Sequence, residues 1–172
     1  DDTAAAFADA GALPQQIVLR TLSRERLDES LAAFARALAE AQILALPGGF
    51  SAGDEPAGSG TYIAAVLQAP VIREGIEERF VEGDRLILGI CNGFQALVRT
   101  GLVPFGRFVE RRPGWPALAP NTIGRHVSRS VLTRIDSDLG PWMAAGSPGE
   151  LASVPVSHGE GRLLCAPSIL SD

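Results

Sequence analysis

The residues best suited to chemistry lie in segment 89–95, Gly-Ile-Cys-Asn-Gly-Phe-Gln, at the end of the apolar run 86–90. Such a run predicts a buried strand, and helical spacing resumes after it. Cys91 is therefore expected at the tip of a strand-to-helix turn, where backbone N–H groups and the positive helix end favour a thiolate and a developing oxyanion. Gly89 and Gly93 flank it as glycines flank the serine in Gly-x-Ser-x-Gly.

Each cysteine could also have a purely structural role. Cys91 could be a small apolar side chain that ends a core strand, but the two glycines around it favour the chemical role. Cys165 follows Leu164 and precedes Ala166 and Pro167, without glycines on either side. We interpret Cys165 as a structural residue.

A second glycine-rich segment, residues 47–54, also follows a predicted strand, at residues 42–46. Sites in open α/β sheets form at the carboxyl ends of strands, so this loop and the Cys91 turn are expected to face the same crevice. Gly48 and Gly49 would let backbone N–H groups approach a substrate carbonyl or carboxylate. Alone, a diglycine segment is more often a plain turn; together with Cys91 it indicates a binding loop.

The elements that would position these residues alternate along the chain. Helices are expected at residues 3–10, 24–41 (capped by Ser23), 58–81 (in two parts, broken at Pro70) and after Cys91, and strands at residues 16–19, 42–46 and 86–90. This order predicts an α/β fold, an open and mostly parallel sheet with helices on both faces. Residues 122–135 and 151–156 alternate like strands, which we interpret as a more antiparallel C-terminal annex of one single domain, residues 1–172.

Composition excludes several classes of protein. The 172 residues suit one domain, and a formal net charge of −5 argues against nucleic acid or an anionic membrane as partner. All 15 basic residues are arginine, which excludes a lysine Schiff base and a Walker-A lysine within this chain. Two separated cysteines and two histidines indicate neither a disulfide framework nor a metal site. No apolar run suits a membrane helix, and we expect a reducing, cytoplasmic setting.

The two ends of the chain suggest a piece of a longer polypeptide. The chain begins Asp1-Asp2-Thr3, without a basic-then-apolar leader, and it stops without a finishing element. We therefore expect neighbouring residues in the parent protein.

Four segments carry a family resemblance. In chain order they are residues 46–54 (Leu-Pro-Gly-Gly-Phe-Ser-Ala-Gly-Asp), 89–95, 121–126 (Asn-Thr-Ile-Gly-Arg-His) and 155–162 (Pro-Val-Ser-His-Gly-Glu-Gly-Arg). Together they resemble the glutaminase domain of phosphoribosylformylglycinamidine synthase, a class I glutamine amidotransferase of purine biosynthesis. The resemblance covers essentially the whole chain, and it implies a flavodoxin-like fold.

The resemblance also implies a reaction. Cys91 would attack the side-chain amide of glutamine, release ammonia and leave a thioester that water hydrolyses. Ammonia would pass to a synthetase partner, on the same chain or on another subunit. That partner would use ATP and Mg²⁺ to convert formylglycinamide ribonucleotide to its amidine, while this domain would need no cofactor of its own.

Site roles follow from the same resemblance. The backbone N–H of Asn92 and one from Gly49 or Phe50 would form the oxyanion hole. Gly48 and Gln95 would hold the substrate.

Two features of the family are not found in the sequence. These are its first strand and a later catalytic His-x-Glu segment of the type His-Pro-Glu-Arg or His-Ser-Glu-Arg. Since general acid–base help is worth about 10²–10⁴-fold, we expect the chain by itself to be close to inactive.

The segment His158-Gly159-Glu160 has the same His-x-Glu spacing as the catalytic segment that is not found. In an extended strand, His158 and Glu160 would point to the same face and could pair. We interpret them as substrate-proximal or interface residues rather than as the catalytic base; a His–Glu hydrogen bond that holds a turn is the alternative. His126 is expected near the site rim or on a solvated face. Asp54 and Glu55 are interpreted as loop-capping carboxylates rather than an acid pair.

Two other functions stay open at this stage. The chain could be a non-catalytic docking module that keeps the amidotransferase fold. It could also be a different cysteine-dependent enzyme, acting on another amide or on an aldehyde.

Overall fold

The computed structural model describes residues 2–51, 54 and 58–170. The chain forms two compact units, Asp1–Ala117 with Leu164–Asp172, and Leu118–Leu163. We call them unit 1 and unit 2 and describe each by itself. Within the described residues, no helix has the length and hydropathy needed to span a bilayer.

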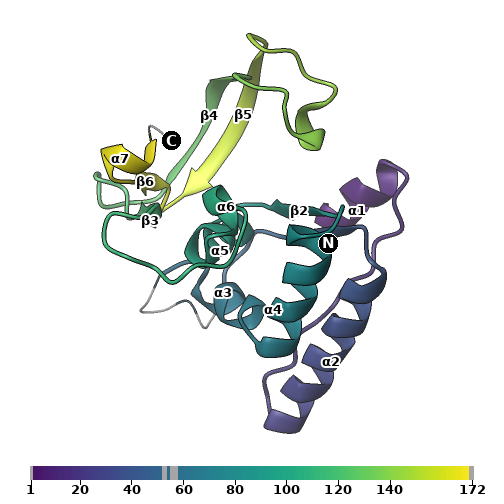
Figure 1. The fold of residues 1–172 in the computed structure, drawn as a ribbon. Coiled ribbons are helices and arrows are strands. Elements are labelled where there is room, and N and C mark those ends of the chain that lie inside the picture. The colour runs from purple at the N-terminus through teal and green to yellow at the C-terminus, as the bar shows by residue number, and fades with distance from the viewer. Residues whose placement is uncertain (1, 52–53, 55–57, 171–172) are drawn as a thin grey trace. The chain divides into compact units, whose positions relative to one another are not determined.

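Unit 1 alternates helices with two parallel strands. Its elements are α1 (Asp2–Asp9), α2 (Arg24–Glu40), β1 (Ile43–Leu46), α3 (Thr61–Leu67), α4 (Pro70–Ile76), the π-helical turn η2 (Glu77–Val81), β2 (Leu86–Gly89), α5 (Asn92–Thr100), α6 (Leu102–Phe105) and α7 (Pro167–Leu170) (Figure 1). β1 and β2 pair in parallel from Ile43↔Leu86 to Leu46↔Gly89. The predicted α/β fold with a parallel sheet is confirmed.

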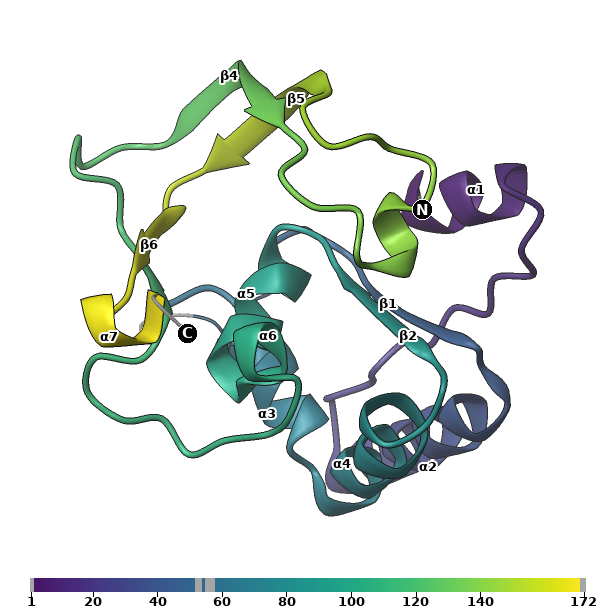
Figure 2. The same cartoon turned by 45° about the horizontal axis from the view of Figure 1, so that its top comes forward.

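The core of unit 1 lies where its helices meet. α2 packs against α4, α3 against α5, and α5 against both strands (Figure 2). Leu38, Leu67, Ile72 and Ile76 are fully buried between them. α4 begins with Pro70, whose fixed φ suits the first helical position, so the predicted break at Pro70 is confirmed.

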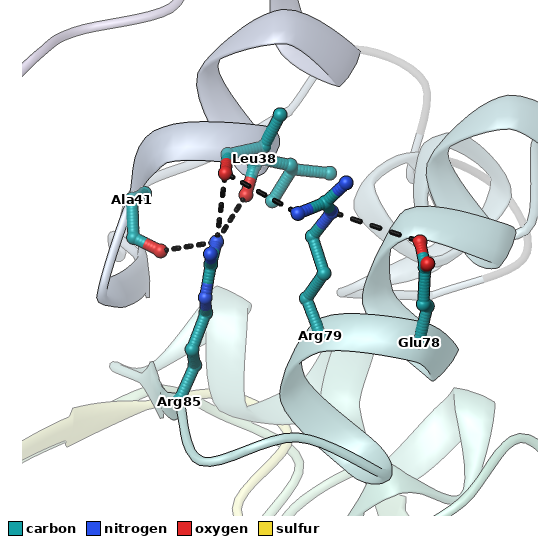
Figure 3. Close-up of polar contacts among 6 residues, drawn as sticks. Leu38, Ala41, Glu78, Arg79 and Arg85 are labelled. Carbon is teal, nitrogen blue, oxygen red and sulfur yellow. Dashed lines mark hydrogen bonds and ion pairs between the residues drawn. The ribbon is translucent and has the colours of Figure 1, made fainter.

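α2 is capped at both ends by side chains. Ser23 Oγ accepts the Arg26 N–H at 3.3 Å, which confirms the predicted N-cap. At the other end, Arg85 Nη1 donates to the carbonyl oxygens of Leu38 (2.8 Å) and Ala41 (2.8 Å) (Figure 3). The last carbonyls of a helix have no partner within the helix, and positive charge is favourable there. Because Arg85 directly precedes β2, this cap fixes the end of α2 to the start of the strand.

The predicted strand at residues 16–19 is wrong. The segment forms neither helix nor strand and has no ladder partner among the described residues. Ile17 and Leu19 pack against the core while Val18 is 71% exposed, which is the alternation of a strand without its neighbour. An apolar run predicts which side chains turn inward, whereas a strand also needs a second backbone beside it.

Unit 2 is built on an antiparallel ribbon. β4 (Val127–Arg134) and β5 (Leu151–His158) pair from Val127↔His158 to Arg134↔Leu151, and the 3₁₀ turn η3 (Pro141–Met143) lies in their connection. β3 (Ala117–Ala119) and β6 (Arg162–Leu164) pair where the chain enters and leaves the unit. The predicted antiparallel character of this region is confirmed; the assignment of the whole chain to one domain stays a prediction.

Candidate active site

Cys91 lies at the turn between β2 and α5. β2 ends at Gly89 and α5 begins at Asn92, so Cys91 is the N-cap residue of the helix. Its side chain is exposed. Its backbone has φ 52° and ψ −107°, and no other described residue except glycine has a positive φ. Such a conformation costs about 1–3 kcal/mol and is typical of functional sites. The predicted strand–turn–helix with an exposed thiol is confirmed.

The two flanking glycines are required by close contacts. A Cβ on Gly89 would lie 2.6 Å from Leu97 Cδ1. A Cβ on Gly93 would lie 2.7 Å from the backbone carbonyl carbon of Leu46, the last residue of β1. No side chain fits at these distances, so glycine at position 93 lets the first turn of α5 approach the end of β1, and glycine at position 89 lets α5 approach the end of β2.

The diglycine loop, residues 47–50, passes directly beside the cysteine. A Cβ on Gly48 would lie 3.1 Å from Cys91 Cβ and 4.0 Å from Cys91 Sγ. Gly49 has φ 116° with open space around it, and Phe50 is 96% exposed. The structure therefore brings the two predicted segments together, at the carboxyl ends of β1 and β2.

A helix N-terminus faces the same place. The Gly93 N–H donates to Ile90 O at 2.9 Å and the Gln95 N–H donates to Cys91 O at 3.0 Å. The Asn92 N–H has no acceptor among the described residues, as expected for the first residue of a helix. An anion beside Cys91 would therefore meet an uncommitted N–H and the positive end of α5.

A buried polar pair lies below the turn. The side chain of Asn92, only 3% exposed, donates from Nδ2 to Asp54 Oδ2 at 3.0 Å and to Ser51 Oγ at 3.3 Å. Asp54, 7% exposed, accepts the Tyr62 N–H on Oδ1 at 2.9 Å. Asp54 thus accepts an N–H from the first turn of α3, which agrees with a capping carboxylate, whereas Glu55 lies outside the described residues. Sequence reasoning missed the Asn92 side chain, for which the only signal was an amide next to the cysteine.

Gln95 and Cys165, the two remaining residues of unit 1 that the sequence analysis singled out, are less exposed than Cys91. Gln95 is buried in α5, and a Cβ on Gly60 would lie 2.9 Å from Gln95 Cβ, so the base of this side chain faces α3. Its contact with substrate stays a prediction. Cys165 is half-buried between β6 and α7.

His158 and Glu160 belong to unit 2. The condition of an extended strand through both residues is not met, because β5 ends at His158 and the chain bends at residues 159–160. His158 Nδ1 bonds to Asn121 Oδ1 at 2.9 Å. Asn121 Nδ2 donates to the carbonyl oxygens of His158 and Arg125, both at 2.9 Å, which identifies Oδ1 as the acceptor. His158 Nδ1 therefore carries the proton, and the imidazole holds a turn.

His126 lies on the exposed surface of the ribbon. Its Nε2 is 2.8 Å from Ser157 Oγ. This agrees with a position on a solvated face.

An exposed cysteine on a strained strand-to-helix turn, beside a glycine loop at the ends of parallel strands, defines a class of α/β enzymes that use a cysteine nucleophile. The sequence model of the CobB/CobQ-like glutamine amidotransferase domain matches residues 1–172. The chain belongs to this family.

Individual relatives show which members of the family this chain is similar to. The phosphoribosylformylglycinamidine synthase subunit PurQ of Dehalococcoides mccartyi is 34% identical, over 99% of this chain and 60% of that protein. PurQ of Trichormus variabilis is 33% identical, over 78% of this chain and 53% of that protein. A chain of the solved PurLQS structure from Thermotoga maritima is 31% identical with a TM-score of 0.57, over 72% of this chain and 50% of that one.

These relatives confirm the family resemblance and the class I amidotransferase fold. The chain spans about half the length of the curated relatives it matches.

Proposed function

We propose that this chain hydrolyses the side-chain amide of glutamine and supplies the ammonia for the synthesis of phosphoribosylformylglycinamidine in purine biosynthesis. The observation that carries the proposal is the exposed Cys91, held in a strained conformation between the Asn92 N–H and the diglycine loop. The PurQ relatives support the same reaction.

The reaction forms and breaks one covalent bond to the enzyme. Cys91 Sγ attacks the amide carbon of glutamine, and the negative charge develops on the amide oxygen. The C–N bond then breaks, the nitrogen takes up a proton, and ammonia leaves a γ-glutamyl thioester. Water adds to the thioester carbon, and cleavage of the C–S bond gives glutamate and returns the thiol of Cys91.

Backbone amides stabilise the charge in this scheme. The Asn92 N–H and an N–H from Gly49 or Phe50 form the oxyanion hole. Removing one donor of this kind typically costs about 10²–10³ in kcat. Gly48 and Gln95 contribute to the glutamine site. His158 and Glu160 are secondary candidates for substrate contact.

The ammonia is consumed by a synthetase domain or subunit. That partner binds ATP and Mg²⁺ and forms the amidine, whereas the glutaminase chemistry needs no cofactor in this chain. We place the reaction in the cytoplasm, with the rest of purine synthesis. The similarity to PurQ proteins and to a chain of PurLQS supports a synthetase partner.

Labelling with a chloroketone analogue of glutamine tests the proposal. We expect one covalent adduct, on Cys91, which excess glutamine prevents. The matched control is Cys165→Ala, which should be labelled like the unchanged protein, while Cys91→Ala should not be labelled. Labelling on Cys165, or labelling that glutamine does not slow, would contradict glutaminase chemistry.

A further inference from the structure

The diglycine loop is attached at its N-terminal end to the turn that carries Cys91. Leu46, the residue before the loop, accepts the Ile90 N–H on its carbonyl oxygen at 3.0 Å. The same residue lies against Gly93, where a Cβ would come within 2.7 Å of its carbonyl carbon. This end of the loop is therefore fixed by backbone contacts and by the buried side chain of Leu46.

The loop is attached at its C-terminal end by side chains. Asn92 Nδ2 reaches Ser51 Oγ and Asp54 Oδ2, and the second oxygen of Asp54 holds the Tyr62 N–H. Asp54 also accepts the Gly58 N–H on its backbone carbonyl at 2.6 Å. Its carboxylate thus joins the start of α5 to the start of α3.

Asn92 is held in one orientation. A carboxylate only accepts hydrogen bonds, so Nδ2 and not Oδ1 must face Asp54. Asn92 Oδ1 is then buried, and no partner for it is found among the described residues. A buried acceptor without a partner costs about 1–3 kcal/mol. The side-chain amide of Asn92 is therefore oriented by the two bonds that Nδ2 donates, and this orientation leaves Oδ1 without a partner among the described residues.

These attachments fix a short arc of backbone. Residues 47–50 lie between Leu46, which lies against Gly93, and Ser51, which the Asn92 side chain contacts; the Asp54 N–H in turn donates to Ser51 O at 3.0 Å. Cys91 is the residue immediately before Asn92. The position of the loop amides relative to Cys91 Sγ therefore depends on the bonds that the Asn92 side chain makes to Ser51 and Asp54.

We infer that Asp54 and the Asn92 side chain are positioning residues, which hold the amides of the diglycine loop where the oxyanion of the glutamine reaction forms. This inference rests on the proposed function. Neither side chain touches the reacting atoms. Oxyanion donors act only when they lie about 2.7–3.1 Å from the oxygen, so a small displacement of the loop removes their effect. The predicted consequence is a loss in kcat, because the charge exists in the transition state and not in bound glutamine.

The test combines two variants in the full-length protein carrying this sequence. Asp54→Ala removes the carboxylate, so Asn92 Nδ2 and the Tyr62 N–H both lose their acceptor. Asn92→Ala keeps the backbone N–H but removes the donor. The matched control is Asp84→Ala, which removes an exposed carboxylate in the turn before β2.

We expect each of the two variants to lower kcat for glutamine hydrolysis at least about tenfold, with KM changed by less than about threefold. The double variant should be within about twofold of the worse single variant, because both remove the same bond. Iodoacetamide alkylation of Cys91, followed on its own peptide by mass spectrometry, forms no oxyanion and should proceed at the rate of the unchanged protein. Asp84→Ala should change none of these quantities.

Other outcomes distinguish a failure of the proposed function from a failure of the positioning role. If Cys91→Ala still hydrolyses glutamine, the proposed function is wrong. If Cys91→Ala is inactive but both variants keep the kcat of the unchanged protein, the positioning role is wrong while the function stands. If kcat and the alkylation rate fall together, or if the losses of the two variants multiply, the bond only supports folding, and the inference is overturned.

Discussion

The Cys91 turn of unit 1 and the His158 turn of unit 2 look alike in sequence, since each places a reactive side chain at or just after the end of a strand and within two residues of a glycine. Their structures differ. At Cys91 the polar bonds are made by neighbouring residues, and the thiol itself is exposed. At His158 the imidazole itself makes the bond, to Asn121. A functional residue in this fold is thus recognised by where its neighbours direct their hydrogen bonds, more than by its type.

The largest effect is expected at the cysteine. Cys91→Ala should abolish glutamine-driven turnover of the full-length protein, by at least about 10³-fold, because no other group can form the thioester. Ammonia-driven turnover should be unchanged. Both rates are measured with the same synthetase assay, and loss of both would contradict the separation of the two half-reactions.

The glycines distinguish the two turns in stability. Gly93→Ala should lower the free energy of unfolding by at least about 2 kcal/mol, since its Cβ would overlap the backbone of Leu46. Gly159→Ala is the matched control, because a Cβ there would meet nothing within 4 Å. Urea denaturation measures both. Equal losses would mean that the Cys91 turn is no more tightly packed than the His158 turn.

A smaller effect is expected at Asn121. Asn121→Ala removes the partner of His158 and two bonds to backbone carbonyls, so the ribbon β4–β5 should lose about 1–3 kcal/mol of local stability. Hydrogen exchange of the ribbon amides measures this loss. Labelling of Cys91 by the glutamine analogue should not change. Slower labelling would indicate that Asn121 and His158 contribute to the glutamine site.

The smallest effect concerns Tyr62, the only tyrosine in the chain. Burial raises the pKa of its phenol above the ordinary value of about 10. The folded state therefore favours the neutral phenol, and this contribution to stability is fully present below about pH 10 and lost as pH rises through the folded pKa. Phenolate absorbance of the folded protein should have a midpoint above that of a tyrosine peptide. An equal midpoint would mean that the α3 surface next to Asp54 is solvated.

Much of the framework could be predicted because its signals are local. The helix from Arg24 has a serine cap and regular apolar spacing, and the strands that end at Leu46 and Gly89 are short apolar runs followed by glycine loops. Residues 16–19 are also a short apolar run, although no glycine loop follows them. They form no strand because pairing depends on a neighbour that the run itself does not specify.

The arrangement inside the site was harder to predict. Asn92 and Asp54 are 38 residues apart, and neither residue type indicates the other as its partner. The end of β5 at His158 has a similar origin, since Asn121, which bonds to the imidazole, lies 37 residues earlier. Long-range side-chain pairs of this kind depend on how the elements pack.

The most direct test of the central claim is to mix the full-length protein with glutamine, quench in acid and determine the mass of the peptide that contains Cys91. The account predicts a γ-glutamyl adduct on Cys91 that disappears once glutamine is exhausted and that is absent from Cys91→Ala. Continued release of ammonia from glutamine by Cys91→Ala, or an adduct on Cys165 instead, would contradict it.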